Sequence, residues 1–358
     1  MCTGLFIPLT GTASRCPAEE AGSCHWTGCA LRPSRRPGSV LRVGTGALTV
    51  PEDVLRRSAG RSIDEETEEA DMPLVGIGHL TMLDIAPPDW VSLAHDAGFD
   101  AVGIRAAAIG PTEEEWPMRA GSPMLAETLR RMGDTGVRVL DAELIRIDPQ
   151  TVIAKYEPLF ETAAAMGASF LNVMADDPEL HRARDTFAAL AEAARPYGLR
   201  PAIEAIPYMQ VKTLSDAVVL VGESDGGIII DPLHLQRSGG TPADVHSLDP
   251  KLIAYCQLCD APLAAPHNLP RPRELPRGQS VEGITDLALE ARAVRLLPGD
   301  GELPLAEIIS AVPAGVPFSV ETPNLALLES LGAIEFARRA RQAVARLLAV
   351  AAPAGGPE

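Results

Sequence analysis

Residues 198–231 read GLRPAIEAIPYMQVKTLSDAVVLVGESDGGIIID and contain the pattern that decides the fold. Gly198 ends a helix-like segment, and the apolar run 201–204 that follows predicts a buried β-strand. The next stretch, 213–221, predicts a helix, and the run 228–231 predicts a second strand. Strand, helix and strand in this order form one parallel βαβ unit, and each strand ends in an acidic residue.

The same alternation extends in both directions from this unit. Strands are predicted to begin at residues 75, 101, 138, 170, 201, 228, 252 and 318. Helices are predicted over residues 87–97, 124–135, 151–166, 179–197, 213–221, 304–311 and 334–350. Eight strands that alternate with helices over residues 72–350 predict a (β/α)8 barrel of the TIM type rather than an open doubly wound sheet.

One long interval separates the seventh and the eighth predicted strands. It contains the Pro-rich polar segment 266–277, which we expect to lie over the catalytic face as a loop or lid. Arg271, Arg273 and Arg277 belong to this segment. They suit an anionic substrate group and a solvated loop equally well.

The first 71 residues have a different composition from the rest of the chain. They mix Gly, Pro, Ser, Arg and Cys without a sustained helix or strand period, and they end in the acidic run 64–71. Such a composition predicts a disordered extension. Four of the six cysteines lie here, but their spacings match no zinc pattern. Met72 precedes the first predicted strand and would make a natural start. Residues 351–358 are expected to form a short tail.

Composition excludes several classes of function. The chain has 358 residues and a net charge of −17, which argues against binding to a nucleic-acid backbone. No run of 18 apolar residues occurs, so we expect no membrane span. Neither a convincing secretory signal nor paired barrel cysteines are evident, which favours the cytoplasm. The oligomeric state is left open, and a homo-oligomer is compatible with the sequence.

Every predicted strand ends in a residue that can ionise or form hydrogen bonds. Enzymes with this barrel place their chemistry at the carboxyl ends of the strands. The residues there are His79, Arg105, Asp141 or Glu143, Asn172, Glu204, Asp231 with His234 beyond it, Gln257 with Asp260 beyond it, and Glu321. A barrel with a purely structural role has no reason to concentrate such residues at this end.

The last four strand ends give the sharpest hypothesis. Glu204, Asp231, Gln257 and Glu321 end strands five to eight, which are neighbours in a closed barrel. Three carboxylates in one small space repel each other, and a divalent cation relieves that repulsion. An oxygen-rich set suits Mg²⁺, Mn²⁺ or Co²⁺ better than a thiolate site does. The alternative is that these residues form surface ion pairs or cap the helices that follow.

The segments around these residues resemble a known family. The stretches in question are residues 203–207 (IEAIP), 230–240 (IDPLHLQRSGG), 255–262 (YCQLCDAP), 297–303 (LPGDGEL) and 320–322 (VET). They are similar to the xylose isomerase-like TIM barrel superfamily, in its sugar phosphate isomerase/epimerase branch, which shares its domain with endonuclease IV. The resemblance covers roughly residues 72–350, and its motifs are not specific for a substrate.

The resemblance implies one metal ion held by Glu204, Asp231, Gln257 and Glu321. Ketose epimerases of this group usually have histidine where this chain has Gln257. That departure favours an all-oxygen site and moves the chain toward dehydroshikimate dehydratases and inosose-type enzymes. Endonuclease IV holds three zinc ions with several histidines. This chain carries Arg105 and Glu143 at the matching strand ends and has few histidines, so DNA repair is disfavoured.

Four further residues are expected to contact the substrate. In the family, the histidine at the position of His234 reaches the substrate or the metal. Arg105 is expected to recognise a carboxylate or phosphate through a bidentate contact. His79 and Asp260 are weaker candidates, and a structural hydrogen bond is the alternative for each histidine. The CxxC pair of Cys256 and Cys259 lies within a predicted strand, so core packing is expected rather than redox chemistry.

These observations predict an enzyme. The favoured function is a divalent-metal-dependent isomerase or epimerase of a sugar or polyol carbonyl compound. In it the metal stabilises an enediolate, while Glu204 and Glu321 take and return the proton. The alternative is a dehydratase or lyase of the dehydroshikimate or inosose type, which shares the first half-reaction. A further alternative is a non-catalytic barrel that binds a ligand in the same pocket.

Overall fold

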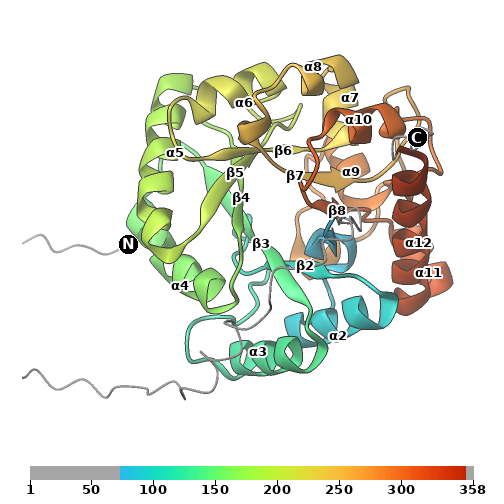
Figure 1. Ribbon diagram of the computed structural model, residues 1–358, viewed down its shortest axis with the longest axis horizontal. Coiled ribbons are helices and arrows are strands. Elements are labelled where there is room, and N and C mark those ends of the chain that lie inside the picture. The colour runs from blue at the N-terminus through green and yellow to red at the C-terminus, as the bar shows by residue number, and fades with distance from the viewer. Residues whose placement is uncertain (1–72, 352–358) are drawn as a thin grey trace, which may run out of the picture. The chain divides into compact units, whose positions relative to one another are not determined.

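A computed structural model describes residues 73–351 as a closed barrel of parallel strands surrounded by helices (Figure 1). Each strand pairs with the next in sequence order, and the first pairs with the last. The strands are β1 (Val75–Ile77), β2 (Ala101–Arg105), β3 (Arg138–Ile147), β4 (Phe170–Ala175), β5 (Arg200–Glu204), β6 (Gly227–Ile230), β7 (Ile253–Leu258) and β8 (Phe318–Val320). The predicted (β/α)8 barrel is confirmed.

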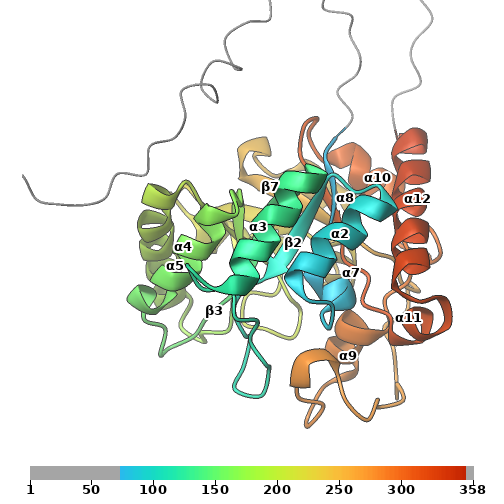
Figure 2. The same cartoon turned by 90° about the horizontal axis from the view of Figure 1, so that it is seen from below.

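Helices connect the strands on the outside of the barrel. The α-helices are α2 (Pro87–Ala97), α3 (Pro123–Thr135), α4 (Glu157–Ala165), α5 (Leu180–Ala194), α6 (Leu214–Val221), α7 (Pro232–Arg237), α8 (Pro242–His246), α9 (Asp286–Ala293), α10 (Leu305–Ala311), α11 (Leu325–Leu331) and α12 (Ala333–Ala351). Short 3-10 turns are η1 (His79–Met82), η2 (Ile153–Tyr156), η3 (Arg195–Tyr197), η4 (Pro250–Leu252) and η5 (Pro276–Gly278). Figure 2 shows α9 and the long connection between β2 and α3 at the same end of the barrel.

Local sequence signals explain the helices that were predicted. The first, α2, begins with two prolines and ends at Gly98, which adopts the left-handed conformation that glycine tolerates best. Helix α6 begins with a capping box formed by Thr213 and Asp216. The helix predicted over residues 151–166 divides instead into η2 and α4, and Pro158 lies in the first turn of α4. The short helices α7, α8, α9 and α11, of six, five, eight and seven residues, are additions to the predicted elements.

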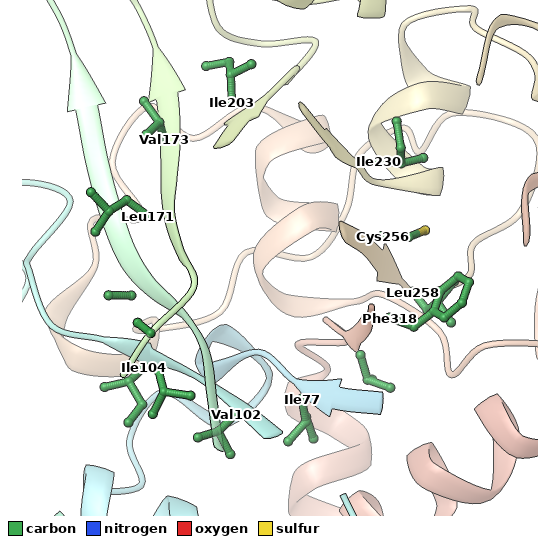
Figure 3. Packing of buried hydrophobic residues seen from close by; sticks show 14 of the residues in the cluster. Ile77, Val102, Ile104, Leu171, Val173, Ile203, Ile230, Cys256, Leu258 and Phe318 are labelled. Carbon is green, nitrogen blue, oxygen red and sulfur yellow. The ribbon is translucent and has the colours of Figure 1, made fainter. Parts of the chain in front are cut away.

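The apolar core lies between the strands and the helices. Ile203 of β5, Ile230 of β6, Cys256 of β7 and Phe318 of β8 all belong to it (Figure 3). Because successive side chains of a strand point to opposite faces, their neighbours point into the barrel. Inside the barrel, a second and smaller cluster contains residues such as Ala202, Ile229 and Tyr255.

This alternation decides which way the predicted site residues face. Glu204 follows the core residue Ile203, and Gln257 lies between the core residues Cys256 and Leu258. Asp231 and Glu321 follow Ile230 and Val320 in the same way. All four therefore face the barrel interior at the carboxyl ends of their strands.

The predictions for residues 1–71 and for most of the short tail lie outside the described residues. Ala351, the first residue of the predicted tail, is the last residue of α12. Within residues 73–351, no helix combines the length and the apolar character that a bilayer crossing requires. Cys256 and Cys259 are buried free thiols, as core packing of this pair predicts.

Candidate active site and metal centre

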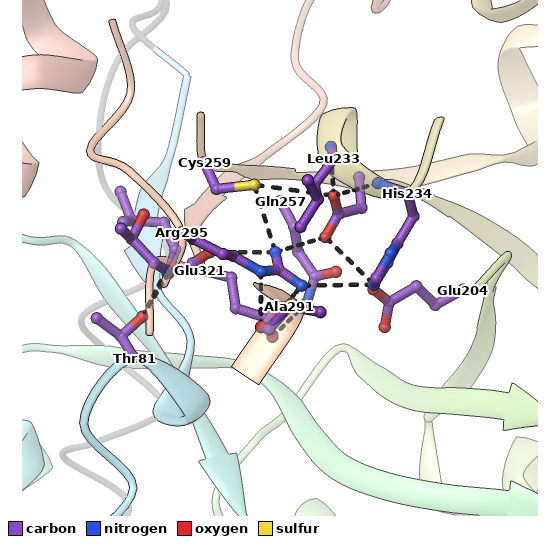
Figure 4. A network of polar contacts seen from close by, with 12 residues as sticks. Thr81, Glu204, Leu233, His234, Gln257, Cys259, Ala291, Arg295 and Glu321 are labelled. Atoms are coloured by element: carbon purple, nitrogen blue, oxygen red, sulfur yellow. Dashed lines mark hydrogen bonds and ion pairs between the residues drawn. The ribbon is translucent and has the colours of Figure 1, made fainter. Parts of the chain in front are cut away.

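The four side chains predicted to bind a metal lie in one connected polar network (Figure 4). The exposed fractions of Glu204, Asp231, Gln257 and Glu321 are 6%, 4%, 1% and 3%. The Gln257 Nε2 group donates a hydrogen bond of 2.9 Å to Glu321 Oε1. Within the part of the chain that the structure describes, these four residues therefore form no surface ion pairs, which were the alternative. Instead they converge inside the barrel.

His234 connects Glu204 with Asp231. The His234 Nε2 atom lies 3.3 Å from Glu204 Oε1 and 4.0 Å from Asp231 Oδ2. Ligand atoms of Glu204, Asp231 and His234 all lie within 4.8 Å of one another. His234 is held there because Asp231 caps α7, accepting the backbone N–H groups of Leu233 and His234 at 2.8 and 3.1 Å. Asp231 can therefore cap α7 and also bind a metal ion, so these two alternatives do not exclude each other.

Arg295 is the site residue that sequence reasoning missed. Its Nη1 atom lies 2.7 Å from Asp231 Oδ2, and its Nη2 atom lies 3.2 Å from Glu321 Oε2. The side chain is 1% exposed and is also held by the carbonyl groups of Ala291 and Glu321. Arg295 follows α9 within the long interval before β8, where no strand end drew attention to it.

Burial and charge act differently on the two acids that Arg295 contacts. Burial alone would raise the pKa of Asp231, but Arg295, His234 and the backbone N–H bond lower it below its usual value. Burial raises the pKa of Glu321 well above its usual value, with Arg295 opposing and Glu204 adding to the rise. The negative charge of Glu204 therefore helps to raise the pKa of Glu321, as expected for acids that converge on one small space.

The donor set fits a divalent cation. Within the described residues, Glu204 Oε1 and Gln257 Oε1 are buried oxygen atoms without a hydrogen-bond donor. Buried acceptors are seldom left without a partner. Two such oxygens beside Asp231 and His234 match the preference of divalent ions for oxygen and imidazole ligands. His234, which the resemblance implies reaches the substrate or the metal, lies close enough to Glu204 and Asp231 to share an ion with them.

Arg105 lines the pocket but is already neutralised. Its Nε atom lies 3.1 Å from Glu143 Oε2, and its Nη1 atom lies 3.3 Å from Glu113 Oε1. All three side chains are buried. Burial raises the pKa of Glu143, and Arg105 opposes that rise. With two carboxylates as partners, the Arg105 guanidinium has little capacity left for the anionic substrate group expected from the sequence.

His79 is fully buried behind the site and does not line the pocket. Its Nε2 atom donates to the Ile85 carbonyl at 2.8 Å, and its Nδ1 atom accepts the Arg105 backbone N–H at 3.0 Å. The ring stacks on Trp90 with the centroids 5.4 Å apart. The structure therefore places His79 in the structural role that was the alternative to a substrate contact.

The burial of His79 makes stability depend on pH. Burial lowers the pKa of His79 from 6.5 to about 3. The unfolded chain therefore takes up a proton as the pH falls through 6.5, whereas the folded chain does not, so stability falls with the pH. Between pH 7 and pH 5, we expect the free energy of unfolding of His79→Gln to fall by about 2 kcal/mol less than that of the wild type. Urea unfolding at both pH values measures this difference. The exposed His246 provides the control variant His246→Gln, and an equal loss in all three proteins would contradict the assignment.

Asp260 fixes a loop and does not line the pocket. Its carboxylate accepts the backbone N–H groups of Ala261, Leu303 and Gly299 at 2.8, 3.0 and 2.9 Å. A Cβ atom on Gly301 would lie 2.4 Å from Asp260 Oδ1, so glycine is required for this close approach. The structure thus gives Asp260 a loop-holding position in place of the expected substrate contact.

The pocket above the network is lined by both apolar and charged side chains. Leu144, Met174, Ile206 and Met209 form one apolar wall. The polar and charged residues that line it are Glu143, Asn172, Glu204, His234, Glu321, Arg105, Arg292 and Arg295. Arg292 of α9 has no ion pair or hydrogen bond to another described residue. Tyr208 also lines the pocket, and burial raises its pKa to about 12, so its phenol stays protonated.

The chain reaches the pocket just after the Pro-rich segment. Gln279, which follows η5, lines the pocket and donates to Glu113 Oε2 at 3.2 Å. Arg271 pairs with Asp286 at 2.5 Å, and Arg277 lies 3.7 Å above the centroid of the Trp116 ring. Arg273 is exposed. The three arginines of this segment therefore make contacts within the loops or face solvent, and none of them lines the pocket.

Comparison with known proteins supports one family. The model of the family described as xylose isomerase-like TIM barrel matches residues 91–348. A solved xylose isomerase-like TIM barrel/4-hydroxyphenylpyruvate dioxygenase fusion protein is 20% identical, with a TM-score of 0.62, over 77% of this chain. The chain spans 42% of the length of that fusion protein. No curated protein matches the chain.

Smaller solved structures match over nearly their whole length. The IOLI protein, which binds a zinc atom, is 18% identical with a TM-score of 0.57, over 77% of this chain and 98% of its own. The probable 3-DHS dehydratase AsbF from Bacillus anthracis is 15% identical with a TM-score of 0.55, over 76% and 98%. A D-psicose 3-epimerase is 13% identical with a TM-score of 0.55, over 76% and 98%. At these identities the likeness extends to the fold alone.

Proposed function

Because the chain belongs to the xylose isomerase-like TIM barrel family, we propose that it is a divalent-metal-dependent isomerase or epimerase. It would act on a sugar or polyol carbonyl compound by moving a proton at the carbon beside the carbonyl. The observation that carries the proposal is the convergence of Glu204, Asp231, His234 and Glu321 at the carboxyl end of the barrel. An epimerase, a probable dehydratase and a zinc-binding protein share this fold, which supports the reaction class without fixing it.

The proposed roles follow from the hydrogen bonds of each carboxylate. Both oxygens of Glu321 have donors, from Gln257 and from Arg295. Glu204 Oε1 has no hydrogen-bond donor within the described residues, so it has a lone pair available to accept a substrate proton. We therefore assign proton abstraction to Glu204 and proton return to Glu321, on the opposite side of the network.

Other side chains hold the substrate and the ion. Glu204, Asp231, Gln257, Glu321 and His234 supply the available ligand atoms for a divalent ion such as Mg²⁺, Mn²⁺ or Co²⁺. When bound, such an ion polarises the substrate carbonyl and so acidifies the neighbouring C–H bond. The apolar wall of Leu144 and Met174 limits the entry of water beside the reacting carbon.

One observation favours a dehydratase or lyase as the second candidate. Arg292 reaches the pocket without an ion-pair partner among the described residues, while Arg105 and Arg295 are both neutralised. An arginine without an ion-pair partner, such as Arg292, suits a substrate carboxylate. The four apolar side chains that line the same pocket suit a carbon ring with few hydroxyl groups better than an open sugar. A hydroxyl beside the carbanion would then leave as water after the same proton abstraction.

Solvent isotope exchange tests the proposal and separates the candidates. The protein is loaded with Mn²⁺ and incubated in D₂O with a panel of ketoses, inososes and dehydroshikimate. An isomerase or epimerase places deuterium on the carbon beside the carbonyl without loss of water. A dehydratase produces a new conjugated chromophore. Binding of a panel member without exchange or chromophore would contradict both and indicate a non-catalytic barrel.

Metal removal gives a second expected result. Chelation with EDTA is expected to abolish isotope exchange, and addition of Mg²⁺, Mn²⁺ or Co²⁺ is expected to restore it, because the carbonyl loses its polarising charge. The measurement is the exchange rate before chelation, after chelation and after metal addition. An unchanged rate in metal-free protein, verified by elemental analysis, would contradict a metal-dependent function.

A further inference from the structure

The Arg295 guanidinium lies among the very groups that were predicted to bind a divalent ion (Figure 4). Its Nη1 atom is 2.7 Å from Asp231 Oδ2, and its Nη2 atom is 3.2 Å from Glu321 Oε2. The same Nη2 atom is 3.4 Å from His234 Nε2, which in turn contacts Glu204. A cation supplied by the chain itself therefore neutralises the acid cluster in this structure.

The hydrogen bonds place Arg295 on carboxylate oxygens that a divalent ion would also use. Asp231 Oδ1 accepts two backbone N–H groups, and Asp231 Oδ2 accepts Arg295. Glu321 Oε1 accepts Gln257, and Glu321 Oε2 faces Arg295. Among the four predicted ligands, the buried oxygens that accept no donor from the described part of the chain are the Oε1 atoms of Glu204 and Gln257. An ion bound by all four predicted ligands would therefore share Asp231 and Glu321 with Arg295. Two buried cations held by the same two carboxylates repel each other strongly, so the ion would displace Arg295 from them.

We propose that Arg295 is an exchangeable cation, which neutralises Asp231 and Glu321 in the metal-free protein and releases them when a divalent ion binds. This inference rests on the proposed function only in requiring that a divalent ion bind here. Three buried carboxylates without a cation would repel each other and destabilise the barrel end. Arg295 removes that penalty, so the site is assembled before the ion arrives. Its hydrogen bond from Nε to the Ala291 carbonyl, 2.8 Å, keeps the side chain tethered during the exchange.

The exchange has a direct consequence for metal affinity. Part of the binding energy of the ion is spent on breaking the ion pairs of Arg295. Arg295→Gln removes this competition and leaves the acids with no other cation, so we expect the variant to bind Mn²⁺ at least about tenfold more tightly than the wild type. The metal-free variant should unfold at a lower temperature than metal-free wild type. Its rise in unfolding temperature on adding Mn²⁺ should be larger.

Calorimetric titration of chelator-treated protein with Mn²⁺ measures the affinities. The matched control is Arg237→Gln, which breaks another buried arginine–glutamate pair, from Arg237 Nη2 to Glu290 Oε1 at 2.7 Å, outside the acid cluster. This control should lower stability but leave Mn²⁺ affinity unchanged. Equal or weaker binding by Arg295→Gln, with binding by the wild type intact, would overturn the exchange and leave the proposed function standing.

The remaining outcomes are also decisive. If neither protein binds Mn²⁺, both the exchange and the metal-dependent function fail. If only Arg295→Gln binds, the exchange is supported and the wild type is not a metal enzyme under those conditions. A measurement on the wild type covers the case of a variant that does not fold. The Nε–H signal of Arg295 in a ¹⁵N NMR spectrum of the wild type, assigned through its correlations with the side-chain carbons of Arg295, should shift on addition of Mg²⁺. An unshifted signal at saturating Mg²⁺ would overturn the exchange.

Discussion

Replacing Glu204 with glutamine is expected to lower turnover by about 100- to 10,000-fold, the usual contribution of a general base. The change removes the negative charge that accepts the proton and keeps the shape of the side chain. Glu204 Oε1 has no hydrogen-bond donor within the described part of the chain, and His234 Nε2 lies 3.3 Å from it. Because few contacts are lost, we expect the free energy of unfolding to change by less than about 1 kcal/mol.

Two measurements separate the role of Glu204 in catalysis from a role in folding. Turnover is followed by deuterium incorporation from D₂O, and stability by urea unfolding. The control Glu290→Gln should give the opposite pattern, because Glu290 forms a buried ion pair with Arg237 outside the acid cluster. It should lose stability and retain turnover. Full turnover by Glu204→Gln would remove Glu204 from the mechanism and favour a binding barrel.

The largest expected effect on stability comes from Asp231→Ala. Asp231 and Arg295 are both almost fully buried, and their charged atoms lie 2.7 Å apart. Removing the carboxylate leaves the guanidinium without its closest partner and also removes the N-cap of α7. Breaking such a pair from one side costs about 3–5 kcal/mol. Urea unfolding of the metal-free proteins measures the loss.

A double variant checks the cause of that loss. In Asp231→Ala/Arg295→Met the guanidinium is removed together with its closest partner. Glu321 also loses its ion pair with Arg295, but burial raises its pKa well above the usual value, so it can bind a proton instead. The double variant should therefore be more stable than Asp231→Ala alone, even though it carries one more substitution. If the second substitution instead adds a further loss, the ion pair is not the reason why Asp231 stabilises the fold. Asp231→Asn keeps an oxygen for the helix cap and isolates the loss of charge.

The sequence carries enough information to place the four strand-end residues. An apolar strand followed by a single acid, as in Ile228-Ile229-Ile230-Asp231, states both where the strand ends and which face the acid takes. Parallel strands in a closed barrel then bring such ends together. This periodicity alone is enough to predict that Glu204, Asp231 and the neighbouring strand-end residues converge.

The partners of these residues could not be predicted in the same way. Arg295 lies between α9 and β8, in a stretch whose path depends on long-range contacts such as the hydrogen bond between Leu296 N and the Asp260 carbonyl. Arg105 was placed correctly at a strand end, yet its neutralisation depends on Glu113, eight residues away in an irregular loop. Periodicity does not describe such contacts, and they decide which of the charged side chains is available to a ligand.

The alternation of inward and outward side chains has a consequence for how this barrel can vary. Deleting or inserting one residue within β5, β6, β7 or β8 would turn the side chains beyond it to the opposite face. An acid would then be driven among aliphatic groups, and an isoleucine would replace it in the interior. The connections after these strands carry no such constraint. Natural relatives and laboratory libraries should thus differ in length between these strands and keep their length within them.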